Sequence, residues 1–413
     1  MARTDTARSA SGTSIVTVAL CYFIAVFEGF DLQAAGVAAP KLGPAFAMTP
    51  GQLGWFFSMS TFGLMVGAAI GGRLSDRFGR KTVLIGSIVA FGLMSIGNAL
   101  SPNVEALLVF RFLTGMGLGG ALPNLVALVA ENTAPERKNA MVGLLYAGLP
   151  TGGALVSAMS LLGGAENWQL VFAIGGLAPL LIVPLVVLLL PESRQLQAVK
   201  AVEPEAGGRG FAFALFQENR AARTLLLWGA FFLSLLTMYI LLNWLPTLLV
   251  GRGLSRPQAS LVQMSFNVLG ACASYLTGVL MDRLPFRTVV LISFVTAAAG
   301  LVLLAVAPAQ IGVSLIVGGV VGATMSMTQA MLYALAPANY PTRVRGTGVG
   351  SAVAAGRLGS AVGPLLAGVL LGGGASPQQV LTVLIPIIAV AGLGAFVLVV
   401  LMGGAELRRL AEA

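Results

Sequence analysis

Four ionisable side chains lie inside long apolar stretches of this 413-residue chain: Glu28, Asp31, Arg111 and Arg357. A charged group surrounded by hydrocarbon costs from about 2.5 to well over 10 kcal/mol, so it persists only where it is paired, hydrated or functional. A carboxylate in such surroundings can take up and release a proton, and a guanidinium group can bind an anion. The chain has no histidine, so any proton exchange must use the carboxylates.

The two acids are three residues apart, which places them on one face of a helix. Two carboxylates so close in a low-dielectric medium repel one another, and this repulsion favours a proton on Glu28 or Asp31 at neutral pH. The alternative is that one of them only forms an ion pair with a buried arginine. We expect one of the two acids to carry a proton.

The two arginines have different surroundings in the sequence. Arg111 is a candidate partner that stabilises the ionised form of Asp31 or Glu28 until a conformational change separates them; the alternative is a permanent structural ion pair. Arg357 has no acid within a helical turn of it. We expect Arg357 to bind a carboxylate through bidentate hydrogen bonds, or else to pair structurally across two halves of the protein.

The elements that carry these residues must span a membrane. Hydrophobic residues make up 57% of the chain and charged residues 9%, and the mean hydropathy is +0.91, which excludes an ordinary soluble globule. Since about 20 apolar residues cross a bilayer, the sequence predicts twelve transmembrane helices. Their expected ranges are 15–39, 52–72, 82–100, 104–130, 140–163, 168–190, 224–250, 258–281, 288–307, 309–336, 346–372 and 377–402.

The net charge of +9 follows the membrane topology and does not indicate nucleic-acid binding. If both termini are cytoplasmic, nineteen Lys and Arg residues fall in inner segments and three, Lys41, Arg252 and Arg256, in outer loops. The basic inner loops are expected to contact membrane lipid. The polar first 14 residues predict no cleaved signal peptide, and the apolar settings of Cys21 and Cys272 predict neither a disulfide nor a metal site.

The chain contains an internal repeat with an offset of 206 residues. Asp76-Arg77 recurs as Asp282-Arg283, and Pro135 recurs as Pro341 at the same offset. Two six-helix halves related as parallel repeats explain this pattern. The expected domains are an amino-terminal bundle over 1–193, a cytoplasmic linker over 194–223 and a carboxy-terminal bundle over 224–413.

Several stretches together resemble the signature set of the major facilitator superfamily. They are GGRLSDRFGRK at 71–81, RFLTGMGLGG at 111–120, Pro191-Glu192-Ser193 and the degenerate repeat at 278–288. Within that superfamily, EGFDLQAAG at 28–36 is similar to the acidic first-helix motif of the aromatic acid:proton symporters, except that Glu28 replaces an aspartate. The resemblance implies an all-α membrane protein in which Glu28, Asp31 and Arg111 couple transport to protons. It also implies a protein of the bacterial inner membrane that imports a hydroxylated aromatic carboxylate, and we expect this protein to be a monomer.

An aromatic acid needs ring-binding surface in addition to Asp31 and Arg357. The predicted binding residues that supply rings and polar groups are Tyr239, Asn243, Trp244, Gln329 and Tyr333. The alternative is that the aromatic rings are anchors at the membrane interface. Pro246 breaks backbone hydrogen bonding beside Asn243, where a cavity could form.

The charged loop at 71–81 is predicted to act as a cytoplasmic gate. The resemblance places Asp76 at the amino end of the eleventh helix, and the predicted gating residues are Asp76, Arg77, Arg80, Asp282 and Arg283. No nucleotide-binding fingerprint is present, so we expect no cofactor and a proton gradient as the energy source. The alternatives are an exporter of drugs or aromatic compounds, a sensor that binds the acid without transport, and, least favoured, an enzyme.

Overall fold

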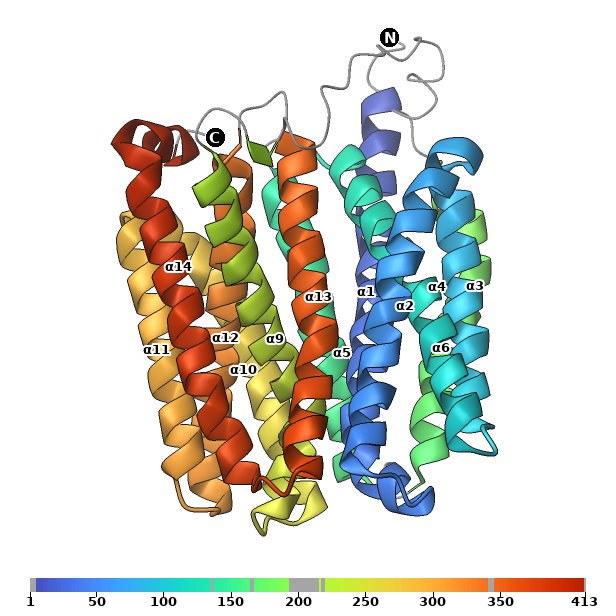
Figure 1. Cartoon of the computed structure of the whole chain (residues 1–413). Coiled ribbons are helices and arrows are strands. Elements are labelled where there is room, and N and C mark those ends of the chain that lie inside the picture. Colours follow the sequence, from blue (N-terminus) through green and yellow to red (C-terminus); the bar gives the residue numbers. More distant parts are fainter. Residues whose placement is uncertain are drawn as a thin grey trace. The chain divides into compact units, whose positions relative to one another are not determined.

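A computed structural model describes residues 5–134, 137–163, 167–192, 215–216, 220–340 and 345–411. Within these ranges the chain forms twelve long helices and no strand, which confirms the predicted all-α class (Figure 1). The helices are α1 Asp5–Ala45, α2 Pro50–Phe78, α3 Arg80–Ala99, α4 Val104–Glu131, α5 Lys138–Leu161, α6 Trp168–Leu189, α9 Ala221–Gly251, α10 Arg256–Arg283, α11 Phe286–Val306, α12 Ile311–Ala338, α13 Arg345–Gly372 and α14 Pro377–Ala411.

Eleven of these helices are long and apolar enough, in their described residues, to cross a membrane. The twelfth, α10, also has 28 residues, and several of its side chains, among them that of Tyr275, lie outside the described part of the chain. The helix α1 continues to Ala45, beyond the expected end at residue 39, and contains Pro40 and Pro44. The expected number of helices is therefore confirmed, while the end of the first helix lies later than expected.

The chain divides into two compact units. Unit 1 comprises Met1–Met48 and Met59–Glu205, and unit 2 comprises Thr49–Ser58 and Ala206–Ala413. Each unit contains six long helices, except that the first residues of α2 group with unit 2. Most of the predicted linker, 194–223, lies outside the described residues, so the domain boundaries stay a prediction.

In unit 1, α1 packs closely on α5 while α3 packs on both α4 and α6. The crossing of α1 and α5 depends on glycine: a Cβ atom on Gly29 would overlap the carbonyl oxygen of Leu149, and one on Gly152 would overlap that of Val26. Only a residue without a side chain allows backbones to approach so closely. This contact fixes the part of α1 that carries Glu28 and Asp31.

In unit 2, the closest helix pairs are α10 with α12 and α9 with α13. A Cβ atom on Gly359 of α13 would overlap the carbonyl oxygen of Phe232 on α9. The close approach of these two backbones places Arg357 of α13 against the face of α9 that carries Tyr239. Close packing at a glycine therefore positions Arg357 in unit 2, just as it positions Glu28 and Asp31 in unit 1.

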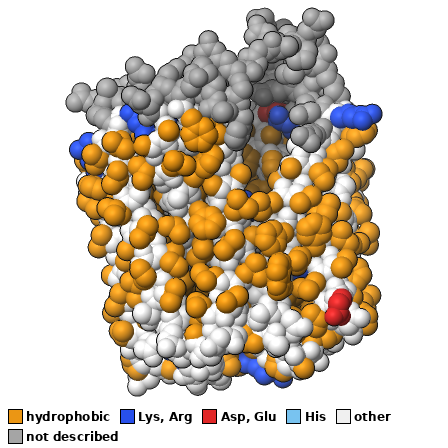
Figure 2. Space-filling model, viewed as in Figure 1, with side chains coloured by type: hydrophobic (Ala, Val, Ile, Leu, Met, Phe, Trp, Pro, Cys, Tyr) orange, Lys and Arg blue, Asp and Glu red, His pale blue; other side chains and the backbone are white. Residues whose placement is uncertain are grey.

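The described surface has the pattern expected of a membrane protein. Figure 2 shows hydrophobic side chains over most of the visible helical face, with the exposed Lys and Arg side chains gathered mainly toward its ends. Large exposed apolar residues such as Leu181, Leu188 and Val295 lie in predicted spans. An apolar surface with charged side chains toward the helix ends has the chemistry expected of a protein that spans a bilayer.

Candidate functional site

In unit 1 the three predicted proton-coupling residues are all buried. Glu28 and Asp31 of α1 are 1% and 0% exposed, and Arg111 of α4 is 1% exposed. Nη1 of Arg111 donates to Oδ2 of Asp31 at 3.2 Å, so the two form an ion pair. The structure therefore identifies Asp31 as a direct partner of Arg111, and Glu28 lies one turn earlier on the same helix.

A second donor holds the other oxygen of Asp31. The hydroxyl of Ser95, on α3, donates to Oδ1 of Asp31 at 2.8 Å and lies 3.1 Å from the carbonyl oxygen of Phe172. The carboxylate is thus bound from two helices at two different oxygens. Movement or protonation of Asp31 would alter contacts to both α3 and α4.

The guanidinium of Arg111 also faces an aromatic ring. Its central carbon lies 5.7 Å from the ring centroid of Phe172 on α6, within the range of a cation–π interaction. Away from water such a contact helps to stabilise the cation. Four helices of unit 1 therefore meet at the Asp31–Arg111 pair.

In unit 2 the cation predicted to bind substrate contacts a tyrosine. Nη1 of Arg357, on α13, donates to the hydroxyl oxygen of Tyr239 on α9 at 2.9 Å. Arg357 is half-buried, and both it and Tyr239 lie close enough to Tyr333 of α12 to act electrostatically on its hydroxyl. The ring of Tyr333 packs edge-on against Phe231, with centroids 5.3 Å apart. The structure thus brings Arg357, Tyr239 and Tyr333 together.

Asn243 and Trp244 bind parts of the protein itself. The side-chain nitrogen of Asn243 donates to the carbonyl oxygen of Tyr239 at 2.9 Å, and Nε1 of Trp244 donates to the carbonyl oxygen of Pro364 at 3.0 Å. Trp244 is 1% exposed and Tyr239 is 8% exposed. Because both rings are buried in the unit, the interfacial-anchor alternative does not describe them. Their contact with a substrate stays a prediction.

Gln329 lies one turn before Tyr333 on α12 and belongs to a buried hydroxyl cluster. Its side-chain nitrogen donates to the hydroxyl oxygen of Ser234 at 2.8 Å. Ser234 and Thr328, which are both fully buried, lie with their hydroxyl oxygens 3.3 Å apart. The sequence analysis identified Gln329 and missed both hydroxyl residues, as it missed Ser95. A polar residue in an apolar helix is the only signal that could have found them.

The predicted gating residues are only partly described. The side chains of Asp76 and Asp282 lie outside the described residues, and Arg77 and Arg283 are exposed. Arg80, at the start of α3, forms an ion pair with Glu131 at the end of α4. The backbone N–H of the next residue, Lys81, donates to Oε1 of Glu192 at 3.1 Å. These contacts connect helix ends within unit 1, and the gating role stays a prediction.

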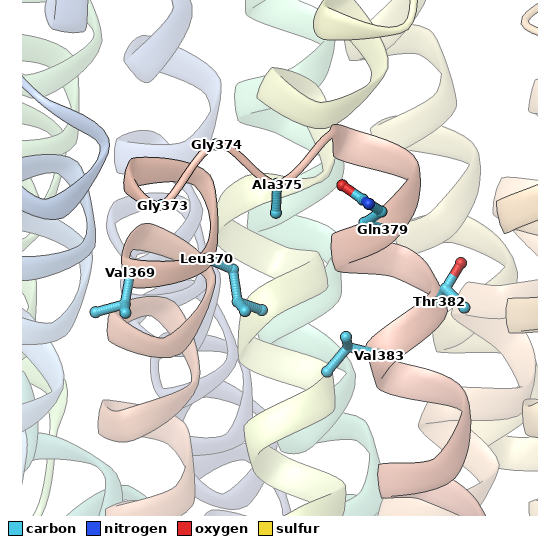
Figure 3. A pocket seen from close by; sticks show the side chains of 8 residues that line it. All are labelled: Val369, Leu370, Gly373, Gly374, Ala375, Gln379, Thr382 and Val383. Atoms are coloured by element: carbon cyan, nitrogen blue, oxygen red, sulfur yellow. The ribbon is translucent and has the colours of Figure 1, made fainter.

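A shallow pocket lies elsewhere, at the turn between α13 and α14 (Figure 3). Its lining residues are Val369, Leu370, Gly373, Gly374, Ala375, Gln379, Thr382 and Val383. Figure 3 shows that only Gln379 and Thr382 present polar side-chain atoms there. A pocket without a cation is a poor site for a carboxylate, so the candidate site remains with the buried charged residues.

Comparison with known proteins identifies the family. The family profile described as Major Facilitator Superfamily matches residues 21–261 and 227–410. The chain belongs to the major facilitator superfamily. Among curated members, the 3-(3-hydroxyphenyl)propionate transporter of Escherichia coli is 42% identical over 96% of both chains. The gallate transporter of Pseudomonas putida is 34% identical and covers 85% of this chain and 84% of its own.

Solved structures of the superfamily have the same fold. The D-xylose–proton symporter aligns with a TM-score of 0.72 at 19% identity, covering 94% of this chain and 96% of its own. The nucleoside transporter NupG aligns with a TM-score of 0.77 at 13% identity, covering 94% and 99%. With the curated relatives, the superfamily assignment establishes a transport protein with multiple membrane-spanning helices. It is therefore not an enzyme, and the sensor alternative is disfavoured.

Proposed function

We propose that this member of the superfamily imports an aromatic carboxylate together with protons by alternating access. The substrate is 3-(3-hydroxyphenyl)propionate or a similar hydroxylated aromatic acid. The observation that carries the proposal is the guanidinium of Arg357, held by the hydroxyl of Tyr239 inside an apolar helix bundle. A cation at this depth is suited to bind a carboxylate, and neighbouring rings are suited to bind an aromatic group.

The curated relatives support the class of substrate. Their printed names include transporters of 3-(3-hydroxyphenyl)propionate, gallate and 4-hydroxybenzoate, each a carboxylate with a hydroxylated ring. Identity to the first of these extends over 96% of the chain. In unit 2 the predicted substrate-binding residues Arg357, Tyr239 and Tyr333 lie close together. Gln329 lies one turn from Tyr333 on α12, and Asn243 and Trp244 lie on the adjoining helix α9.

Proton coupling is assigned to unit 1. When Asp31 is ionised, Arg111 and Ser95 hold it on α3 and α4. A proton that binds to the carboxylate removes its charge and weakens the bond from Arg111, which allows α1 to move relative to α4. Glu28, buried one turn away, is the second group that can take up this proton.

The proposed cycle begins outward-facing, with a proton on Asp31 or Glu28 and the carboxylate on Arg357. Rocking then exposes the site to the cytoplasm, where the proton and the substrate leave. We place the protein in the bacterial inner membrane as a monomer with both termini cytoplasmic. The proton gradient supplies the energy, and no cofactor takes part in the cycle.

The test is uptake of labelled 3-(3-hydroxyphenyl)propionate into proteoliposomes with an acidic exterior. Accumulation against the substrate gradient is expected for the intact protein and should be abolished by a protonophore. A matched control is Glu105→Gln, which changes an exposed acid in the first turn of α4 and should leave uptake unchanged. No accumulation of this or any other aromatic acid under the imposed gradient would overturn the proposal.

The same vesicles distinguish import from export. An exporter that exchanges protons for substrate would accumulate the acid when the vesicle interior is acidic and would fail to do so when the exterior is acidic. The glycine-rich segment 148–153 faintly resembles a motif of drug antiporters. In this structure the segment packs against α1, because Gly152 lies against the α1 backbone. We therefore favour import.

A further inference from the structure

A short chain of hydrogen bonds connects α9 and α12 inside unit 2. Oγ1 of Thr328 donates to the carbonyl oxygen of Met325 at 2.7 Å. Oγ of Ser234 lies 3.3 Å from Oγ1 of Thr328, and Nε2 of Gln329 donates to Oγ of Ser234 at 2.8 Å. The two hydroxyl residues are fully buried, so water does not compete for these bonds.

The number of hydroxyl protons fixes the direction of each bond. A threonine or serine hydroxyl has a single proton to donate. Since Thr328 uses its proton on Met325, Ser234 must donate to Thr328, and Ser234 can then only accept from Gln329. The amide nitrogen of Gln329 therefore faces Ser234. The opposite orientation would place two acceptors against each other.

This orientation leaves the amide oxygen of Gln329 as an acceptor without a donor. Oε1 of Gln329 is shielded from solvent and has no hydrogen-bond partner in the described part of the chain. A buried acceptor that is left unsatisfied costs free energy, which a ligand with a matching donor would recover. The side chain as a whole is only half-buried, so other atoms of Gln329 do reach the surface of the unit.

The position of this oxygen relates it to the carboxylate site. Gln329 precedes Tyr333 by four residues, which is about one helical turn or ~5.4 Å along α12. Long helical side chains lean toward the amino end of their helix, so the ring of Tyr333 extends over the turn that holds Gln329. Tyr333 is in turn close to Arg357 and Tyr239. Gln329 and Arg357 are thus both neighbours of Tyr333, the first along α12 and the second by its electrostatic effect on the tyrosine hydroxyl.

We propose that Gln329 determines substrate specificity by accepting a hydrogen bond from a hydroxyl group on the aromatic ring of the substrate. The inference rests on the proposed function, in which Arg357 binds the carboxylate. Ser234 and Thr328 are positioning residues, because they hold the amide so that its oxygen, and not its nitrogen, faces the ligand. A ring hydroxyl can donate to that oxygen, whereas a ring without a hydroxyl leaves the acceptor unsatisfied.

The experiment compares two acids that differ by a single hydroxyl group. Uptake of 3-(3-hydroxyphenyl)propionate and of 3-phenylpropionate is measured in proteoliposomes, and the ratio of kcat/KM values is the readout. The intact protein should prefer the hydroxylated acid by about tenfold, and Gln329→Met should reduce that preference to about one while 3-phenylpropionate uptake is retained. Gln378→Met, at an exposed glutamine of α14, is the matched control and should keep the preference.

A second variant tests the orientation of the amide and does not alter Gln329 itself. Ser234→Ala removes the acceptor for Nε2, so the amide can rotate and the preference should fall by about threefold. A preference that survives in both Gln329→Met and Ser234→Ala would overturn the inference and leave the proposed function intact. Equal uptake of the two acids by the intact protein would also overturn the inference and leave the proposed function intact. Uptake of neither acid would reject the proposed function together with the inference.

Discussion

Asp31 and Arg111, 80 residues apart in the sequence, form an ion pair in which neither side chain is more than 1% exposed. Ser95 holds the second carboxylate oxygen at 2.8 Å. A buried pair of this kind contributes little net stability, but removal of one partner leaves an uncompensated charge and costs about 3–5 kcal/mol. The pair is therefore suited to a switch in which protonation of Asp31 releases Arg111.

Asp31→Asn should abolish accumulation of substrate under a proton gradient. The amide cannot take up the proton, so substrate movement loses its coupling to the gradient. Exchange of labelled for unlabelled substrate at equal pH on both sides should persist, because the neutral amide mimics the protonated carboxyl group. The measurement is uptake with and without an imposed gradient. Accumulation at the wild-type level in Asp31→Asn would assign coupling to Glu28 or elsewhere.

The sequence predicts this pair because buried charges need partners, and an apolar helix with two acids restricts the choice to Arg111 or Arg357. It could not predict Ser95, since a serine in an apolar helix usually bonds to its own backbone, as Ser157 does with the carbonyl oxygen of Gly153. Twelve helices follow from apolar length alone. The end of α1 was placed too early because Pro40 and Lys41 are typical of a helix end, and the helix continues to Ala45.

The unit 2 site was also only partly predictable. Polar and aromatic types identified Arg357, Tyr239 and Gln329, but no periodicity shows which of them touch. The pairing of Arg357 with Tyr239 depends on the close approach of α9 and α13 at Gly359, which is a property of packing between residues distant in the sequence. The contacts between these helices are therefore known only from the structure.

Arg357→Gln should raise the KM for the aromatic acid at least about tenfold, since a charge-assisted hydrogen bond contributes about 1.5–3 kcal/mol. The glutamine keeps a donor but loses the charge that attracts the carboxylate. Concentration-dependent uptake measures the change, and an uncharged amide analogue of the substrate provides the comparison. If the inhibition constant of the amide rose as much as the KM of the acid, Arg357 would be structural and would not bind the carboxylate.

Tyr239→Phe should have a smaller effect in the same direction. The variant keeps the ring and removes the hydroxyl oxygen that accepts from Arg357 at 2.9 Å, so the guanidinium loses one constraint on its orientation. Because Tyr239 acts on the orientation of the guanidinium and the charge of Arg357 is kept, we expect the KM to rise about threefold to tenfold. In the double variant with Arg357→Gln, Tyr239→Phe should raise the KM little further, because the two side chains act through the same hydrogen bond. Full additivity in the double variant would contradict this interpretation.

Gly29→Ala tests whether backbone contact between α1 and α5 holds the acids in place. A methyl group there would overlap the carbonyl oxygen of Leu149, and overpacking of this kind costs about 1–3 kcal/mol. The apparent Tm of the purified protein, followed by tryptophan fluorescence, should fall by about 1–4 °C. Gly143→Ala is the matched control, because nothing lies within 4 Å of the added atom and alanine favours the helix. Equal Tm values for the two variants would show that α1 and α5 separate readily, and the acids would then need another support.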